Sequence, residues 1–120
     1  MRRDMNLVRE ILMWAENQEH GFVNENPSIE GYSEEEIGYH VHLMHQASLV
    51  NAADDTAMGD KSPSALLSGL SWLGHEFLEA SKDNTIWSKA KNTVLKTTSG
   101  VTFEVLFEWL KAEAKKQLGI

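Results

Sequence analysis

Residues 32–51, YSEEEIGYHVHLMHQASLVN, constrain the fold most, because they combine a helix start signal with an exit into a strand. Ser33 is placed to be the N-cap, and Glu36 completes a capping box three residues later. Glutamates at 34, 35 and 36 fill the first turn, where the helix dipole favours negative charge. We therefore predict a helix over residues 33–48.

This helix has two different faces when its residues are placed at about 100° intervals. One arc is mainly apolar and is predicted to face the core: Ile37, Tyr39, His40, Val41, Leu43, Met44 and Ala47. The opposite arc is predicted to be a contact face: Glu35, Gly38, His42, His45 and Gln46. We call this second set the contact face throughout.

Apolar spacing and turn residues organise the first two thirds of the chain around that helix. They predict a first helix over 3–19, with Asp4 as N-cap and Gly21 as its end. A short strand at 22–23 and a loop to residue 32 follow. Strands over 49–53 and 65–70 flank a polar loop, residues 54–64, and predict a β-hairpin.

Three further helices are predicted after the hairpin. Ser71, Asp83 and Thr102 are the expected N-caps of helices over 72–81, 84–97 and 103–117. Gly100 is expected to break the chain between the last two helices, and Gly119 to end the last one. We predict an organisation in which residues 1–81 form one domain and residues 82–120 form a C-terminal helical extension.

Composition and charge exclude several classes of protein. The chain has 120 residues, 42% of them hydrophobic, and no cysteine, so disulfides and thiolate chemistry are excluded. Its first residues lack a signal-peptide pattern and no apolar run is long enough to span a membrane, so we expect a cytoplasmic protein. Residues 1–60 carry 3 Lys/Arg against 12 Asp/Glu, which disfavours nonspecific binding to nucleic acid.

The order helix, short strand, helix, β-hairpin, helices resembles a winged-helix domain. The segment HVHLMHQASLVNA, residues 40–52, resembles the end of a recognition helix that runs into the first wing strand, with Ser48 where glycine is usual. Residues 1–12, 32–40, 70–80 and 83–91 together resemble a family of bacterial and prophage proteins known only as a domain of unknown function. The resemblance implies an α+β, mainly helical, winged-helix fold with additional C-terminal helices. It implies no activity and no catalytic residue.

Metal binding and catalysis find little support in the motifs. His42 and His45 have the spacing of a zinc-binding pair, but neither a cysteine nor an obvious third ligand accompanies them. We expect His40 to be a buried histidine bonded to backbone or to a carboxylate. The chain lacks HExxH, Walker, dinucleotide-binding and GxSxG motifs. We therefore expect no metal, no cofactor and no enzymatic activity.

Two binding functions remain open. The winged-helix resemblance implies a transcriptional regulator of double-stranded DNA, with the contact face in the major groove and Lys61 and Ser62 in the wing. However, no Arg or Lys lies between Arg9 and Lys61. The alternative is a protein-interaction module, such as a phage accessory factor that binds a basic host protein. The resemblance favours DNA, whereas the charge pattern alone favours protein.

The last predicted helix is apolar on more than one side, which predicts two packing partners. One is the core of the protein. The other is a second subunit, with a candidate dimer interface at Phe103, Phe107, Trp109 and Leu110. A fully intramolecular arrangement is the alternative to this homodimer.

Overall fold

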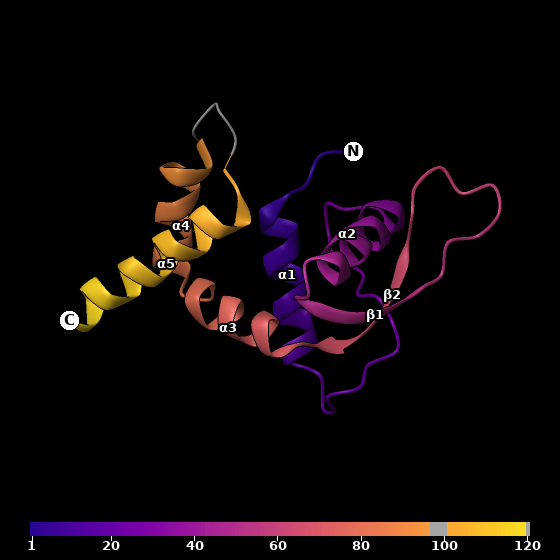
Figure 1. Cartoon of the computed structure of the whole chain (residues 1–120), viewed down its shortest axis with the longest axis horizontal. Coiled ribbons are helices and arrows are strands. Elements are labelled where there is room, and N and C mark those ends of the chain that lie inside the picture. The colour runs from indigo at the N-terminus through magenta and orange to yellow at the C-terminus, as the bar shows by residue number, and fades with distance from the viewer. Residues whose placement is uncertain (97–100, 120) are drawn as a thin grey trace. The chain divides into compact units, whose positions relative to one another are not determined.

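The computed structural model describes residues 1–96 and 101–119, and within them the protein is α+β and mainly helical, as predicted (Figure 1). The elements, in chain order, are α1 (Met5–Glu16), α2 (Glu34–Gln46), β1 (Val50–Asp54), β2 (Ala65–Leu70), α3 (Trp72–Ser81), α4 (Asn84–Asn92), a 3₁₀ turn η1 (Val94–Lys96) and α5 (Phe103–Leu118). This order is consistent with a winged-helix-like layout. No described helix is both long and apolar enough to cross a membrane.

The chain forms two compact units, residues 1–76 and residues 77–120, and their boundary lies within α3. The predicted division into domains after residue 81 stays a prediction. In the first unit, one face of α1 and one face of α2 bury apolar side chains together with the hairpin. Its most deeply buried residues include Leu7, Val8, Ile11, Leu12, Ile37, Val41, Met44, Val50 and Leu67. Each such side chain contributes roughly 1.5–3 kcal/mol of hydrophobic stabilisation.

The helix starts follow the predicted capping residues. Side-chain oxygens of Asp4, Ser33, Asp83 and Thr102 accept hydrogen bonds from amides in the first turns of α1, α2, α4 and α5. Ser33 and Glu36 form both bonds of the capping box. The Ser71 hydroxyl accepts from the Gly74 amide at the start of α3. These bonds satisfy amides that would otherwise have no partner in the helix.

Two predicted helix ends are wrong. Helix α1 ends at Glu16 rather than at residue 19, and Asn17 rather than Gly21 is its cap. Helix α4 ends at Asn92, because Thr93 leaves the helical conformation and its hydroxyl donates to the carbonyl of Lys89. Periodicity alone does not detect such local competition from side chains. Residue 97 and the predicted break at Gly100 lie outside the described residues.

The predicted strand at residues 22–23 is also wrong, although the segment lies where a third strand would lie. The Val23 amide donates to the carbonyl of Ser68 at 2.9 Å, along the free edge of β2. Asn24 then adopts a left-handed backbone (φ 52°), which turns the chain and prevents further pairing. The Asn26 side chain continues the contact: its Nδ2 donates to the carbonyl of Ala65, and its Oδ1 accepts from the amide of Leu67. The Asn26 side-chain amide thus makes the two hydrogen bonds to β2 that the backbone of a neighbouring strand would otherwise make.

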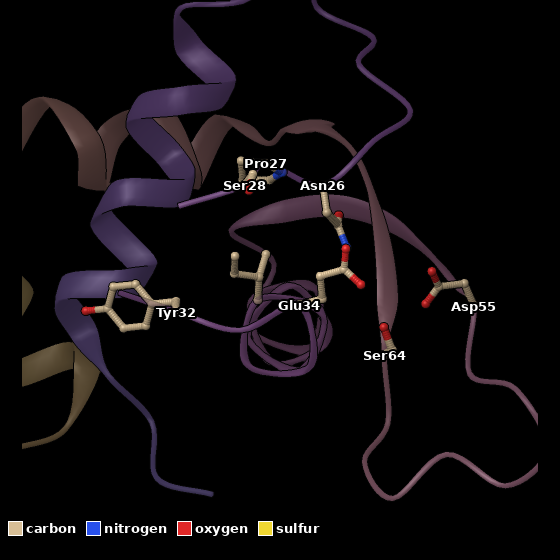
Figure 2. Close-up of a pocket in the computed structure, with 8 residues that line it drawn as sticks. Asn26, Pro27, Ser28, Tyr32, Glu34, Asp55 and Ser64 are labelled. Carbon is tan, nitrogen blue, oxygen red and sulfur yellow. The ribbon is translucent and has the colours of Figure 1, made fainter. Parts of the chain in front are cut away.

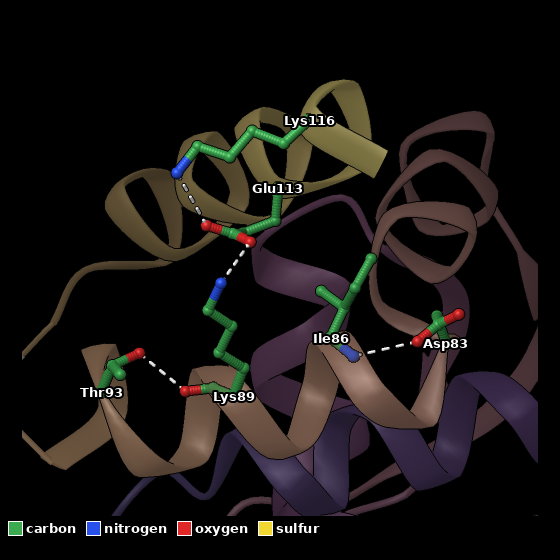
Figure 3. A network of polar contacts seen from close by, with 6 residues as sticks. All are labelled: Asp83, Ile86, Lys89, Thr93, Glu113 and Lys116. Atoms are coloured by element: carbon green, nitrogen blue, oxygen red, sulfur yellow. Dashed lines mark hydrogen bonds and ion pairs between the residues drawn. The ribbon is translucent and has the colours of Figure 1, made fainter. Parts of the chain in front are cut away.

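The second unit buries Phe77, Trp87, Leu106 and Leu110 almost completely. The ring of Phe77 lies 4.8 Å from that of Phe103 and 5.5 Å from that of Phe107, centroid to centroid. An ion-pair network joins α4 to α5, in which Lys89 Nζ lies 2.9 Å from Glu113 and Lys116 Nζ lies 3.4 Å from it (Figure 3). These contacts align the two helices within this unit.

Candidate functional site

The hairpin loop packs against the N-terminal half of the contact face, where it buries Gly38 and leaves Glu35 exposed. Gly38, predicted to point outward, is buried, because Ser64 lies against it: a Cβ atom at residue 38 would overlap the Ser64 hydroxyl. The Ser62 hydroxyl donates to the exposed Glu35 carboxylate at 3.3 Å. The structure therefore brings a predicted wing residue and a predicted contact residue together. The hairpin loop lies against α2, and Lys61 in that loop is exposed.

The C-terminal half of the contact face remains accessible. His45 and Gln46 are exposed, and His42 is half-buried with its ring stacked near that of Tyr39. His45 Nδ1 lies 3.3 Å from the carbonyl of Val50, so its protonated nitrogen donates to the start of β1. No three His, Asp or Glu side chains converge as a metal site would require, within residues 1–96 and 101–119.

Three residues of the predicted core arc are less buried than periodicity suggested. Ala47 is exposed, and Tyr39 and Leu43 are half-buried, whereas Ile37, Val41 and Met44 are buried. The core side of α2 is therefore narrower than the predicted arc.

His40 is buried and bonded to backbone, as predicted. It is 1% exposed, its Nδ1 lies 2.8 Å from the carbonyl of Glu36, and its Nε2 lies 2.9 Å from the amide of Asp4. Because the Asp4 amide is a donor, Nε2 must accept, and Nδ1 carries the hydrogen that is donated to Glu36. The neutral ring thus connects α2 to the residue that caps α1.

A second tie to the same cap comes from Tyr32. Its hydroxyl donates to Asp4 at 3.0 Å and accepts from the Asn6 side chain at 3.4 Å. Burial raises the pKa of Tyr32 above its ordinary 10.0, the hydrogen bond from Asn6 opposes this shift, and the Asp4 carboxylate adds to it. The loop before α2 is therefore fixed to the start of α1.

Six carboxylates lie on α2 and the hairpin, against the single cation Lys61. They are Glu34, Glu35, Glu36, Asp54, Asp55 and Asp60, and we call this surface of residues 33–70 the acidic face. Five of the six residues are exposed, and Glu36 is half-buried. At neutral pH the acidic face therefore presents a concentrated negative charge.

Four of these carboxylates have a local structural role. Glu36 completes the capping box, and Glu35 accepts from Ser62. Asp60 accepts from the Ala57 amide at 2.7 Å. Asp54 accepts from the hydroxyl and the amide of Thr56; these two bonds lower the pKa of Asp54, burial opposes them, and His42 adds a smaller lowering.

The other two, Glu34 and Asp55, accept no hydrogen bond from any side chain or amide in the described part of the chain, and both line one pocket (Figure 2). The pocket has a volume of about 280 Å³. It is lined by Asn26, Pro27, Ser28, Tyr32, Glu34, Ile37, Asp55 and Ser64. It combines the loop before α2, the first turn of α2 and both ends of the hairpin loop.

Sequence reasoning missed this pocket, because its walls come from three segments that only the folded chain brings together. The one available signal was Glu34, since capping explains Glu36 but does not require a second acid in the same turn. Asp55 was interpreted only as part of a polar loop.

The fold and this surface define a class of protein: a small α+β protein, consistent with a winged-helix-like layout, with an acidic face and a pocket beside its second helix. The chain belongs to the family described as "Hypothetical protein (DUF2513)", whose model matches residues 2–101. It is also similar to an uncharacterized protein of Haemophilus influenzae, with 33% identity over 95 residues that cover 78% of this chain and 79% of the relative. No solved structure matches the chain.

The match to the family model includes the whole acidic face and the pocket, and it ends before α5 begins at Phe103. The resemblance found in the sequence to a domain of unknown function is thereby confirmed.

Proposed function

We propose that the protein is a non-enzymatic, cytoplasmic interaction module whose acidic face binds a positively charged segment of another protein. The observation that supports this function is the charge of residues 33–70, which hold six carboxylates and one lysine. A surface of this sign attracts a basic partner, increases the association rate and disfavours acidic partners. A phage accessory factor that acts on a host protein is one biological setting of this proposal.

Regulation by DNA binding is the second candidate. In its favour, His45 and Gln46 are exposed near the end of α2, the helix that the winged-helix resemblance makes the recognition helix. Against it, the hairpin loop covers Gly38 and bonds to Glu35, in the half of the helix that such domains insert first into the groove. The acidic face also lacks the cations whose phosphate contacts release counterions and supply most nonspecific affinity.

Selection of peptides from a random library on the immobilised full chain tests the proposed function. At near-physiological salt, the selected peptides should be enriched in Lys and Arg. Glu35→Lys should weaken their binding about tenfold or more, because it places a cation opposite a cation. Glu19→Lys makes the same charge change at an exposed residue outside the acidic face and should leave binding nearly unchanged. Selection of neutral or acidic peptides would refute the proposal.

A mobility-shift assay separates the two candidates. With genomic duplex fragments at low salt, the protein-binding function predicts no shifted band at micromolar protein. A salt-sensitive shift that Gln46→Ala weakens would support the DNA candidate and argue against the basic partner.

Homodimer formation is part of the same proposal, with one correction. Leu110 is fully buried within the second unit, so it cannot lie in an interface with another copy. The remaining predicted residues, Phe103, Phe107 and Trp109, are half-buried, and Val105 is 55% exposed on the same helix. Phe103 and Phe107 pack on Phe77 within the unit, whereas Val105 and Trp109, four residues apart, form a short apolar strip on one face of α5 that supports contact with a second copy.

A further inference from the structure

The carboxylates of the acidic face differ in what they already bind. Glu35, Glu36, Asp54 and Asp60 each accept a hydrogen bond that stabilises a turn, a cap or the hairpin loop. Truncating any of them would remove that bond, whereas an amide replacement keeps an oxygen that can accept it. Glu34 and Asp55 have no such role among the described residues, and the fold places both beside one cavity.

The cavity also has apolar and aromatic residues in its lining. Ile37 and Pro27 are buried apolar residues in its lining, and the loop residue Tyr32 adds an aromatic ring. The Tyr32 hydroxyl points away from the cavity, toward α1, where it bonds to Asp4 (Figure 2). The ring therefore offers mainly apolar surface.

The Asn26 side chain, which also lines the cavity, already has hydrogen-bond partners. Both ends of the Asn26 amide bond to the backbone of β2. The polar groups left to receive a ligand are therefore mainly acceptors: the Glu34 and Asp55 carboxylates, and the hydroxyls of Ser28 and Ser64.

An apolar lining with carboxylates matches the chemistry of a basic side chain. Lysine and arginine have an aliphatic stem that packs on apolar surface and a cationic head that donates to carboxylates. A volume of about 280 Å³ lies just below the usual range of ligand pockets, so it suits one side chain rather than a large molecule.

We propose that this pocket binds the side chain of one lysine or arginine of a partner protein, with Glu34 and Asp55 as the residues that recognise its charge. This inference rests on the proposed function, because it names the anchor by which a basic segment is held. The aliphatic stem lies against Ile37 and Pro27. The cationic head donates to the two carboxylates, which approach it from α2 and from the end of β1.

The first experiment uses single residues as probes of the full chain. Nα-acetyl-lysine amide and Nα-acetyl-arginine amide are titrated against ¹⁵N-labelled protein, with the isosteric but uncharged Nα-acetyl-norleucine amide as control. Saturable chemical-shift changes are expected at Tyr32, Glu34, Asp55 and Ser64, with a Kd on the order of millimolar for one of the charged probes. No such change, or equal changes with norleucine, would overturn the pocket.

Matched double variants separate the pocket from the general charge of the surface. Glu34→Gln/Asp55→Asn keeps the shape of both side chains and should weaken probe binding about tenfold or more, because two charge-assisted contacts are lost. Glu35→Gln/Asp60→Asn removes the same two charges from the acidic face outside the pocket, keeps an amide oxygen that can accept the bonds from Ser62 and Ala57, and should change binding of the single-residue probe by less than about threefold. Equal weakening by both pairs would contradict the proposal. Unchanged thermal unfolding of both variants confirms that they are folded.

The same variants distinguish failure of the pocket from failure of the proposed function. If selected basic peptides bind but only the Glu35/Asp60 pair weakens them, the acidic face is an interaction surface and the pocket proposal is wrong. If the charged probes bind in the pocket but no basic peptide is selected, the pocket is correct and the proposed function is wrong.

Discussion

At the scale of single residues, His40 shows how one buried side chain can link two helix starts. It accepts from the Asp4 amide and donates to the Glu36 carbonyl, while Asp4 caps α1 and Glu36 completes the capping box of α2. Replacing the ring removes a partner from a backbone group that is shielded from water.

His40→Phe is therefore expected to lower the free energy of unfolding by about 1–3 kcal/mol, because a similar volume is kept but the Asp4 amide loses its acceptor. Urea denaturation measures this change. The control is His75→Phe at an exposed position of α3, which should change stability by less than about 1 kcal/mol. Equal decreases in the free energy of unfolding of the two variants would show that the buried hydrogen bonds of His40 contribute no additional stability.

A second prediction at the scale of single residues concerns Gly74. A Cβ atom at residue 74 would overlap the carbonyl oxygen of Leu49, which is backbone and cannot rotate away. Gly74→Ala should destabilise the protein by about 1–3 kcal/mol, although alanine is the better helix former. Gly21→Ala is the matched control, because the space around Gly21 is open and its φ is not left-handed. Thermal unfolding of both variants decides the point, and a Gly74→Ala variant as stable as the control would contradict it.

The sequence was sufficient to predict several of these single residues and not others. Capping residues such as Asp4 and Ser33 act on amides two or three positions away, so local spacing predicts them. The burial of Gly38 depends on Ser64, 26 positions later in the chain, and no helical period contains that contact. The same limit explains why Glu34 and Asp55 were not recognised as lining one pocket.

At the scale of elements, the pairing of α4 with α5 depends on a carboxylate with little exposed surface. The side chain of Glu113 is 9% exposed and bonds to Lys89 and Lys116 (Figure 3). The hydrogen bond from Lys89 lowers the pKa of Glu113 below its ordinary 4.5, burial opposes this shift, and Lys116 adds to it. Because the pKa is lower in the folded state, the ionised form stabilises the fold above the ordinary value, and this stability is lost as the pH falls through the folded-state pKa.

Glu113→Gln should therefore unfold at a lower temperature than the wild type at pH 7, and the difference should shrink as the pH falls below the ordinary value of 4.5. Thermal unfolding followed by circular dichroism from pH 7 to pH 3 measures this. Glu108→Gln is the control, since Glu108 also pairs with a lysine of α5 but its side chain is 68% exposed. A difference that stays constant with pH would rule out the ion pair as the source of the stability.

The boundaries of elements were predicted more reliably where a turn or capping residue marks them than where only apolar periodicity indicates them. The boundaries of β2 agree with the prediction, because a polar loop and Ser71 mark its ends. Helix α4 was predicted too long, since Thr93 interrupts a stretch whose apolar spacing continues to Val94. The segment at 22–23 was predicted as a strand because its residues favour one, and the left-handed turn at Asn24 was not foreseen.

At the scale of the whole molecule, the oligomeric state follows from how the apolar surface of α5 is used. The second unit buries Leu106 and Leu110 of this helix, and leaves Val105 mostly exposed and Trp109 half-buried. The proposed second copy would cover the apolar strip that Val105 and Trp109 form.

Light scattering of the purified chain should therefore give twice the monomer mass of 13.5 kDa, and Trp109→Glu should give the monomer mass because a charge would enter an apolar interface. Lys115→Glu places the same charge at an exposed polar position of α5 and should remain dimeric. A wild-type chain of monomer mass over the micromolar range would show that the apolar strip does not join two copies.

The Asn26 side chain has a consequence for behaviour at high concentration. A strand with unpaired amides and carbonyls on one side is a template on which other chains can assemble into sheets. Strand β2 pairs with β1 on one side, and on the other side Val23 and the Asn26 amide occupy three of its backbone groups. The Asn26 carboxamide therefore helps to keep β2 from pairing with a strand of a neighbouring molecule. Resistance of the protein to aggregation thus depends in part on a loop that contributes no strand to the sheet.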